Sequence, residues 1–210
     1  MPPPPDIPLT ETEALLIEAY NRILNEPFED KYEDLWEDEP FDRAVEEFRV
    51  LAQEIGVDPN AVIAKCEHVS GPVFSSKHRV VLLDFWASWC DPCVQAGPDL
   101  SDLADEFNGR MAVVGINNES IFGETKSPKR EYLEAFLDDH RDGFRYTIYL
   151  DNAEGDAKEN VYKPAGYRGI PCVVLIFDGV VVYVGSPQES FRPTLEQVLR
   201  VAETEFVRED

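Results

Sequence analysis

Hydrophobic positions divide the chain into a helical first part and an α/β remainder. Up to about residue 65, apolar residues recur at the spacing of amphipathic helices. From residue 79 onward, short apolar runs alternate with helix-spaced segments, which predicts strands alternating with helices in an α/β domain. Strands are expected near residues 79–86, 111–117, 144–150, 172–178 and 180–185, and helices near 90–107, 127–140 and 193–206.

Three helices are predicted in the first part. Thr10 and Glu13 form a capping box for the first, residues 41–55 carry the second, and residues 58–65 carry a short third. Each helix has one apolar face that must be buried. We therefore expect residues 1–66 to form an extension that packs on the remaining domain or on a partner.

The predicted organisation is an acidic helical extension, residues 1–66, followed by one domain, residues 67–210. The net charge is -23, and residues 1–60 hold 17 acidic against 4 basic side chains. Such a chain should repel nucleic acid and anionic membranes, and its charge serves either solubility or a basic partner. Three aromatic residues among these acids form a recognition stripe or pack on the neighbouring domain: Phe28, Tyr32 and Trp36.

No apolar run approaches the length of a membrane span, and the longest covers residues 172–177. The proline-rich start, residues 1–6, lacks the basic and apolar regions of a secretory signal. We expect a cytoplasmic protein, although a chain whose signal has been removed would look the same.

Cys90 and Cys93 follow directly on the apolar strand predicted at 79–86. At the N-terminus of a helix, unpaired backbone N–H groups stabilise a thiolate at Cys90, and Cys93 lies one turn further on. The spacing alone also fits half of a zinc site or a structural disulfide. Zinc would need further ligands at suitable spacing, so no metal is expected, and a dithiol–disulfide cycle at the pair needs no bound cofactor. Such spacing is missing among the remaining cysteines and histidines: Cys66, Cys172, His68, His78 and His140.

The sequence around this pair resembles thioredoxins. Residues 83–98 are similar to the thioredoxin active-site segment, and residues 167–179 to the cis-proline loop with its following strand. Residues 120–150 insert a helix and a strand between the two motifs, which resembles the TlpA/ResA-like branch of thiol-disulfide oxidoreductases. The resemblance implies a thioredoxin-like fold, with a central mixed β-sheet flanked by helices.

Three catalytic residues follow from the resemblance. Cys90, expected to be exposed, is the attacking thiolate, and Cys93 resolves the mixed disulfide. Asp84, without a partner among apolar neighbours, should have a raised pKa and accept the Cys93 proton through water. The alternative for Asp84 is a hydrogen-bonded structural acid.

The resemblance also implies a substrate-binding edge. Trp89 shields one side of Cys90, and Pro171, in the cis form, faces it and blocks metal capture by the thiols. The backbone of Ile170 is then free to pair with an extended substrate.

Three positions depart from the thioredoxin pattern. Asp91 stands in place of a glycine and should make the couple more reducing. Gly115 stands where thioredoxins have a lysine beside the buried acid. Cys172 follows the proline and is either a third redox thiol or a small buried residue.

The favoured function is reduction of protein disulfides, recharged by a dithiol donor such as a thioredoxin reductase system. An alternative is an interaction module that uses the acidic extension. Within enzymes, a disulfide isomerase or oxidase differs mainly in redox potential, whereas the Thr and Arg of a peroxidase site are missing.

Overall fold

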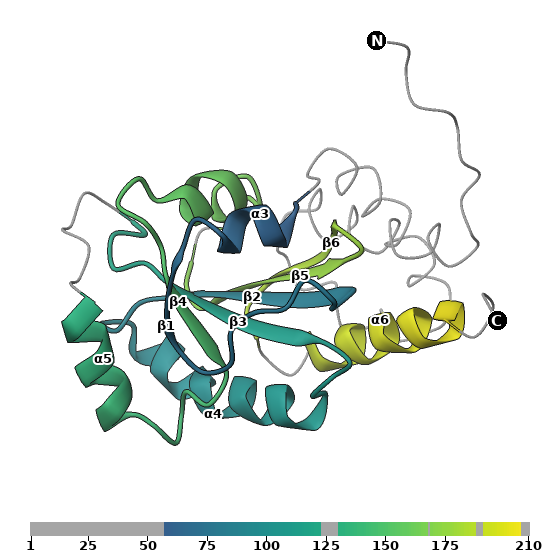
Figure 1. Ribbon diagram of the computed structural model, residues 1–210, viewed down its shortest axis with the longest axis horizontal. Coiled ribbons are helices and arrows are strands. Elements are labelled where there is room, and N and C mark those ends of the chain that lie inside the picture. The colour runs from purple at the N-terminus through teal and green to yellow at the C-terminus, as the bar shows by residue number, and fades with distance from the viewer. Residues whose placement is uncertain (1–56, 123–129, 168, 188–190, 207–210) are drawn as a thin grey trace, which may run out of the picture. The chain divides into compact units, whose positions relative to one another are not determined.

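A six-stranded mixed sheet, in the order β1-β4-β3-β2-β5-β6, organises the part of the chain that the computed structural model describes (Figure 1). That part comprises residues 57–122, 130–167, 169–187 and 191–206. The first two predicted helices and the aromatic residues between them lie outside it. The strands are β1 (Glu67–Ser70), β2 (Val80–Trp86), β3 (Ala112–Asn117), β4 (Thr147–Leu150), β5 (Cys172–Phe177) and β6 (Val180–Gly185).

Strand β2 lies in the middle of the sheet, parallel to β3 and antiparallel to β5. All seven of its residues are buried, as a nearly continuous apolar run predicts for a strand covered on both faces. The parallel pairing of β3 with β4 and the antiparallel pairing of β5 with β6 complete the mixed sheet. The predicted α/β fold class is confirmed.

Helices cover both faces of this sheet. Figure 1 shows α4 and α6 on one face, and α3 with the π-helical turn η2 on the other. The apolar positions of α6 face the sheet at helical spacing, because Phe191, Leu195, Val198 and Leu199 are all buried. The helical elements are α3 (Pro59–Ile63), α4 (Asp91–Glu106), α5 (Arg130–Asp139), η2 (Lys158–Tyr162) and α6 (Phe191–Phe206).

The predicted elements that fall within the described residues occur within a few residues of their expected positions, and two further elements were not predicted. The tight turn between β5 and β6 has positive φ at both Asp178 (49°) and Gly179 (81°), as a two-residue hairpin with primed geometry requires. Strand β1 was missed because it is a short, partly exposed edge strand. The turn η2 was missed because five residues are too few to show a helical hydrophobic period.

The chain divides into two compact units, Met1–Gly56 and Val57–Asp210. Residues 57–66, assigned to the extension above, lie in the second unit. Its first residue, Val57, donates a backbone hydrogen bond of 3.1 Å to Gly179 in the β5–β6 turn. Whether residues 1–56 pack on this unit stays a prediction.

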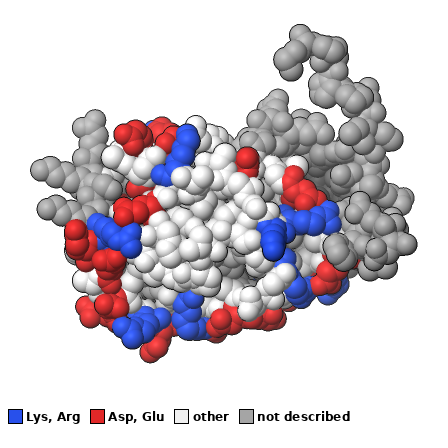
Figure 2. All heavy atoms as spheres, viewed as in Figure 1, with Lys and Arg blue, Asp and Glu red and all other residues white. Residues whose placement is uncertain are grey.

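On the face of the second unit that Figure 2 shows, acidic and basic side chains lie beside one another around the edge, and the middle is largely uncharged. Arg192 contacts Glu106, and Arg145 contacts both Asp102 and Asp105, so these guanidinium groups are paired with carboxylates. Within the described ranges, no helix is both long and apolar enough to cross a bilayer.

Candidate active site

Cys90 and Cys93 form a disulfide at the start of α4, with a Cα–Cα distance of 5.2 Å. Cys90 is the N-cap residue, and its Sγ accepts a hydrogen bond of 3.2 Å from the backbone N–H of Cys93. The helix begins here because Pro92, in the first turn, has no N–H to leave unpaired. The predicted placement of both cysteines at a helix N-terminus is confirmed.

The expected exposure of Cys90 is wrong for this disulfide state. Cys90 is only 5 % exposed and Cys93 only 3 %. One covering group is the loop that precedes β5, where the carbonyl oxygen of Ile170 lies 3.6 Å from Cys90 Sγ. Access to the disulfide is therefore restricted by the residues before the proline.

The Ile170–Pro171 peptide bond is cis, as the resemblance implies. Both residues are partly exposed, so the loop lies at the surface beside the disulfide. The hydroxyl of Tyr162 in η2 donates a hydrogen bond of 3.2 Å to the carbonyl of Gly169 and holds this loop in place.

Asp84 is buried in the middle of β2. Burial raises its pKa to about 7, whereas a hydrogen bond from Tyr146 acts in the opposite direction. The Tyr146 hydroxyl lies 2.8 Å from Oδ2, so the expectation of a carboxylate without a partner is wrong. Nothing in the sequence pattern links these two residues, since they lie in different strand-forming segments.

The side chain of Asp84 lies on the face of the sheet that α4 covers. Asp84 and Trp86 point to the same face because they are two residues apart in a strand. Trp86 stacks on Phe144 with a ring separation of 4.5 Å, and Phe144 lies against Gly97 of α4. The buried acid thus faces the helix that carries Cys93.

Glu119, after β3, holds the loop before Cys90 in place through hydrogen bonds. Its Oε1 accepts hydrogen bonds from the backbone N–H of Ser88 at 2.7 Å and from Asn117 Nδ2 at 2.9 Å. Its backbone carbonyl accepts a third bond, from the indole N–H of Trp89 at 3.2 Å. Sequence reasoning missed Glu119 because a single acid in a loop has no period and no spacing to mark it.

Trp89 is 52 % exposed although its indole N–H is bonded. Its ring contacts Phe122, which is also exposed, at a ring separation of 5.9 Å. Trp89 and Phe122 therefore form an exposed apolar surface next to the disulfide. This surface includes Trp89, the residue predicted to shield Cys90.

The two remaining cysteines are free thiols. Cys172 is fully buried at the start of β5, and burial raises its pKa. Burial and the charges of Asp151 and Asp156 raise the pKa of Cys66 to about 12. Both groups stay protonated near neutral pH, which makes them poor nucleophiles.

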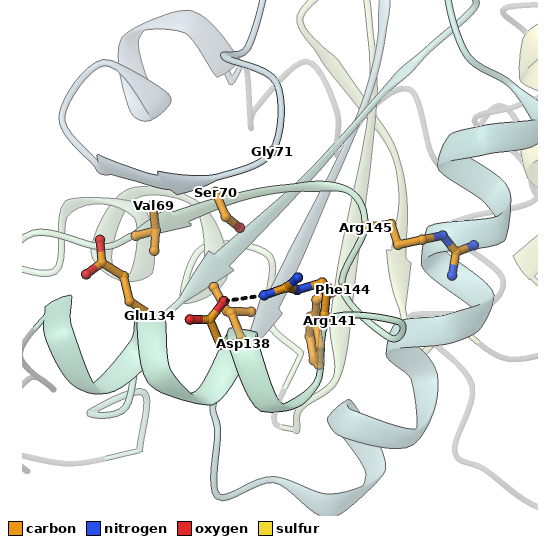
Figure 3. A pocket seen from close by; sticks show the side chains of 9 residues that line it. Val69, Ser70, Gly71, Glu134, Asp138, Arg141, Phe144 and Arg145 are labelled. Atoms are coloured by element: carbon orange, nitrogen blue, oxygen red, sulfur yellow. Dashed lines mark hydrogen bonds and ion pairs between the residues drawn. The ribbon is translucent and has the colours of Figure 1, made fainter.

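A pocket of about 490 Å³ lies between β1 and α5, away from these residues (Figure 3). Arg141 and Asp138 form an ion pair of 3.1 Å across part of its wall. The pocket is lined by Val69, Ser70, Gly71, Glu134, Leu137, Asp138, Arg141, Phe144 and Arg145, and so includes none of the predicted site residues.

Comparisons with known proteins agree with this geometry. The thioredoxin family profile matches residues 52–127. A thioredoxin from Chlorobaculum thiosulfatiphilum is 43 % identical over 49 residues, which cover 22 % of this chain and 45 % of that protein. The thioredoxin-like protein YneN from Bacillus subtilis is 36 % identical over 86 residues, covering 41 % and 46 % respectively. The chain thus spans less than half the length of these curated relatives.

Solved structures show the same fold. A thiol-disulfide isomerase from Corynebacterium glutamicum has a TM-score of 0.51 at 20 % identity, over 63 % of this chain and 90 % of that one. A thiol:disulfide interchange protein from Bacteroides sp. has a TM-score of 0.50 at 18 % identity, over 65 % and 85 %.

The described domain has a thioredoxin-like fold, and the segment that matches the thioredoxin family profile, residues 52–127, includes the cysteine pair. The helix α5 and the strand β4 form the insertion between the cysteine pair and the cis-proline that the sequence predicted. The predicted order of helix and strand in this insertion is therefore confirmed.

Proposed function

We propose that this protein reduces disulfide bonds in other proteins by cycling Cys90 and Cys93 between dithiol and disulfide. The observation that carries the proposal is the Cys90–Cys93 disulfide at the N-terminus of α4, next to the cis-proline loop and above a buried acid. Each part of this arrangement has a chemical use in thiol-disulfide exchange.

The cycle begins with the reduced pair. The Cys90 thiolate attacks one sulfur of the substrate disulfide, so that a mixed disulfide forms and the other substrate sulfur leaves as a thiolate. The Cys93 thiol then gives its proton to Asp84 and attacks Cys90 Sγ. The second substrate sulfur is released, the substrate has gained two electrons, and the Cys90–Cys93 disulfide is restored.

Asp84 suits the role of proton acceptor because burial raises its pKa to about 7. A group that titrates near the working pH exists in both protonation states and passes protons efficiently in either direction. At a normal carboxyl pKa it would hold the Cys93 proton too weakly to assist.

Substrate binding is assigned to Trp89, Ile170 and Pro171. The exposed ring of Trp89 offers apolar contact area next to Cys90. The partly exposed loop before β5 offers the backbone of Ile170 to an extended polypeptide, as an added strand pairs with an open edge.

We further propose that a dithiol donor, such as a thioredoxin reductase system, regenerates the reduced pair in the cytoplasm. The two free thiols, Cys66 and Cys172, favour a reducing compartment. Alkylation of the protein in intact cells would report the redox state of the pair. A cysteine pair that is fully oxidised in the cell would contradict the proposed cytoplasmic location.

Insulin reduction with dithiothreitol tests the mechanism directly. Cys90→Ser should abolish turnover, and Cys93→Ser should accumulate mixed disulfides that non-reducing gels reveal. Cys66→Ser, a cysteine outside the site, is the matched control and should retain activity. Turnover at the wild-type rate in either of the first two variants would contradict the mechanism.

The reduction potential of the cysteine pair distinguishes a disulfide reductase from a disulfide isomerase or oxidase. Equilibration in dithiothreitol or glutathione buffers should give a value near or below roughly -270 mV for a reductase. A value above about -200 mV would favour an isomerase or oxidase instead.

A further inference from the structure

Tyr146 is buried against the proposed proton acceptor. Its hydroxyl donates a 2.8 Å hydrogen bond to Oδ2 of Asp84, and the two residues are only 3 % and 2 % exposed. We propose that Tyr146 is a positioning residue, which fixes the Asp84 carboxyl group and leaves Oδ1 as the oxygen that receives the Cys93 proton. This inference rests on the function proposed above.

Gly115 provides the space for the Tyr146 ring. It pairs in register with Asp84 across β2 and β3. A Cβ at Gly115 would come within 2.9 Å of Tyr146 Cε2 and 2.7 Å of Ile148 Cδ1, closer than such atoms approach. Any larger residue would therefore push the ring away from Asp84. Gly115 of β3 has no side chain to offer to Asp84. The hydrogen-bond partner of Asp84 is instead Tyr146, which lies just before β4 inside the insertion.

The two oxygens of Asp84 have different surroundings. Oδ2 accepts the bond from Tyr146, whereas Oδ1 is buried and has no hydrogen-bond partner among the described residues. A buried acceptor without a partner is costly, so this atom gains most from receiving a proton. Without the tyrosine hydroxyl, rotation of the carboxyl group would make the two oxygens interchangeable.

Other ionisable groups near Asp84 are neutral. On β5, burial and the charge of Asp84 raise the pKa of the Cys172 thiol, so this thiol remains protonated. From α4, the Cys90–Cys93 disulfide does not titrate. From β3, Gly115 has no side chain. The Tyr146 pKa is itself raised well above its usual value, which keeps the hydroxyl a donor.

The hydrogen bond favours the ionised form of Asp84 and so lowers a pKa that burial raises. Tyr146→Phe removes the hydroxyl and keeps the ring. In this variant the pKa of Asp84 should rise further, by about one pH unit, or tenfold in its acid dissociation constant. Single-turnover insulin reduction near pH 7 should then fall about fivefold, since less Asp84 is ionised, and its pH profile should move to higher pH.

Two measurements test this. The carboxyl carbon shift of Asp84 in the oxidised protein, followed by NMR, gives its pKa without any turnover. The pH profile of the reduced protein gives the effect on catalysis. Tyr149→Phe is the matched control, because it removes another buried hydroxyl in the same segment, one that accepts a bond from the Phe74 N–H. It should leave both measurements unchanged.

The Asp84→Asn background distinguishes positioning from general structural damage. There, Tyr146→Phe should produce no further shift of the pH profile, whereas damage to the fold would slow both backgrounds alike. If Tyr146→Phe does not fold, fluorotyrosine at this position serves instead. Its more acidic hydroxyl should lower the pKa of Asp84.

An unchanged Asp84 pKa in Tyr146→Phe, or in the fluorotyrosine protein, would overturn the inference. Failure of the wild-type protein to reduce insulin would count against the proposed function instead. The NMR titration would still decide whether Tyr146 controls Asp84.

Discussion

At the residue scale, Asp84 makes the stability of the fold depend on pH. Its pKa rises from 3.8 to about 7 on folding. Between these two pH values the carboxyl group is therefore protonated in the folded state and ionised in the unfolded state. Stability from this group is complete below about pH 4 and is lost as the pH rises through about 7. The loss amounts to about 4 kcal/mol at most.

Asp84→Asn removes this titration. Urea unfolding of the oxidised protein should show stability falling from about pH 4 to 8 in the wild type, with a much flatter profile in the variant. The variant should be the more stable of the two at about pH 8, because its neutral amide has no buried charge to form. Parallel pH profiles for the two proteins would show that Asp84 is not the group responsible.

At the scale of elements, Asp151 joins the ends of several segments. It follows β4 and is buried, and its carboxylate accepts backbone bonds from Ala157 at 3.0 Å and Lys158 at 3.1 Å, where η2 begins. It also accepts a 2.8 Å bond from the side chain of Asn118, after β3. One side chain thus links two strand ends to the turn that leads to the cis-proline loop.

Asp151→Ala leaves these buried donors without an acceptor. The free energy of unfolding should fall by roughly 3 kcal/mol or more, because each unpaired buried group costs about 1–3 kcal/mol. Asp102→Ala is the control, since its exposed ion pair with Arg145 should contribute less than about 1 kcal/mol. Urea midpoints measure both, and equal losses would contradict the role given to Asp151.

Elements with a strong local pattern were predictable. The apolar run of β2 and the capping position of Cys90 are local properties, and the two motifs placed Pro171 beside the cysteines through the resemblance. By contrast, the contacts of Tyr146 with Asp84 and of Glu119 with Ser88 join residues that only the sheet brings together. The burial of Cys90 likewise depends on a loop some eighty residues away.

At the scale of the whole molecule, we propose that the second unit carries the redox chemistry by itself. All six strands of the described sheet lie between residues 67 and 185, and the predicted catalytic and substrate-binding residues lie within the same span. Residues 1–56 then act as an acidic extension, for solubility or for contact with a partner.

A protein beginning at Val57 should therefore unfold cooperatively and reduce insulin within about twofold of the full-length rate, since small domains of this kind fold as units. Circular dichroism and the insulin assay check the two expectations. Loss of the cooperative transition would show that the extension completes the core. A folded but inactive fragment would instead place part of the active site in residues 1–56.

The burial of β2 has a consequence for the mechanics of the site. The cysteine pair follows only a short loop after the strand that is paired on both sides and covered on both faces. Backbone amides in such a strand exchange with solvent mainly when the entire domain opens. One end of the active-site loop is thus anchored in the slowest-exchanging part of the sheet. Any movement that admits a substrate must come from the other side, in the loop before β5.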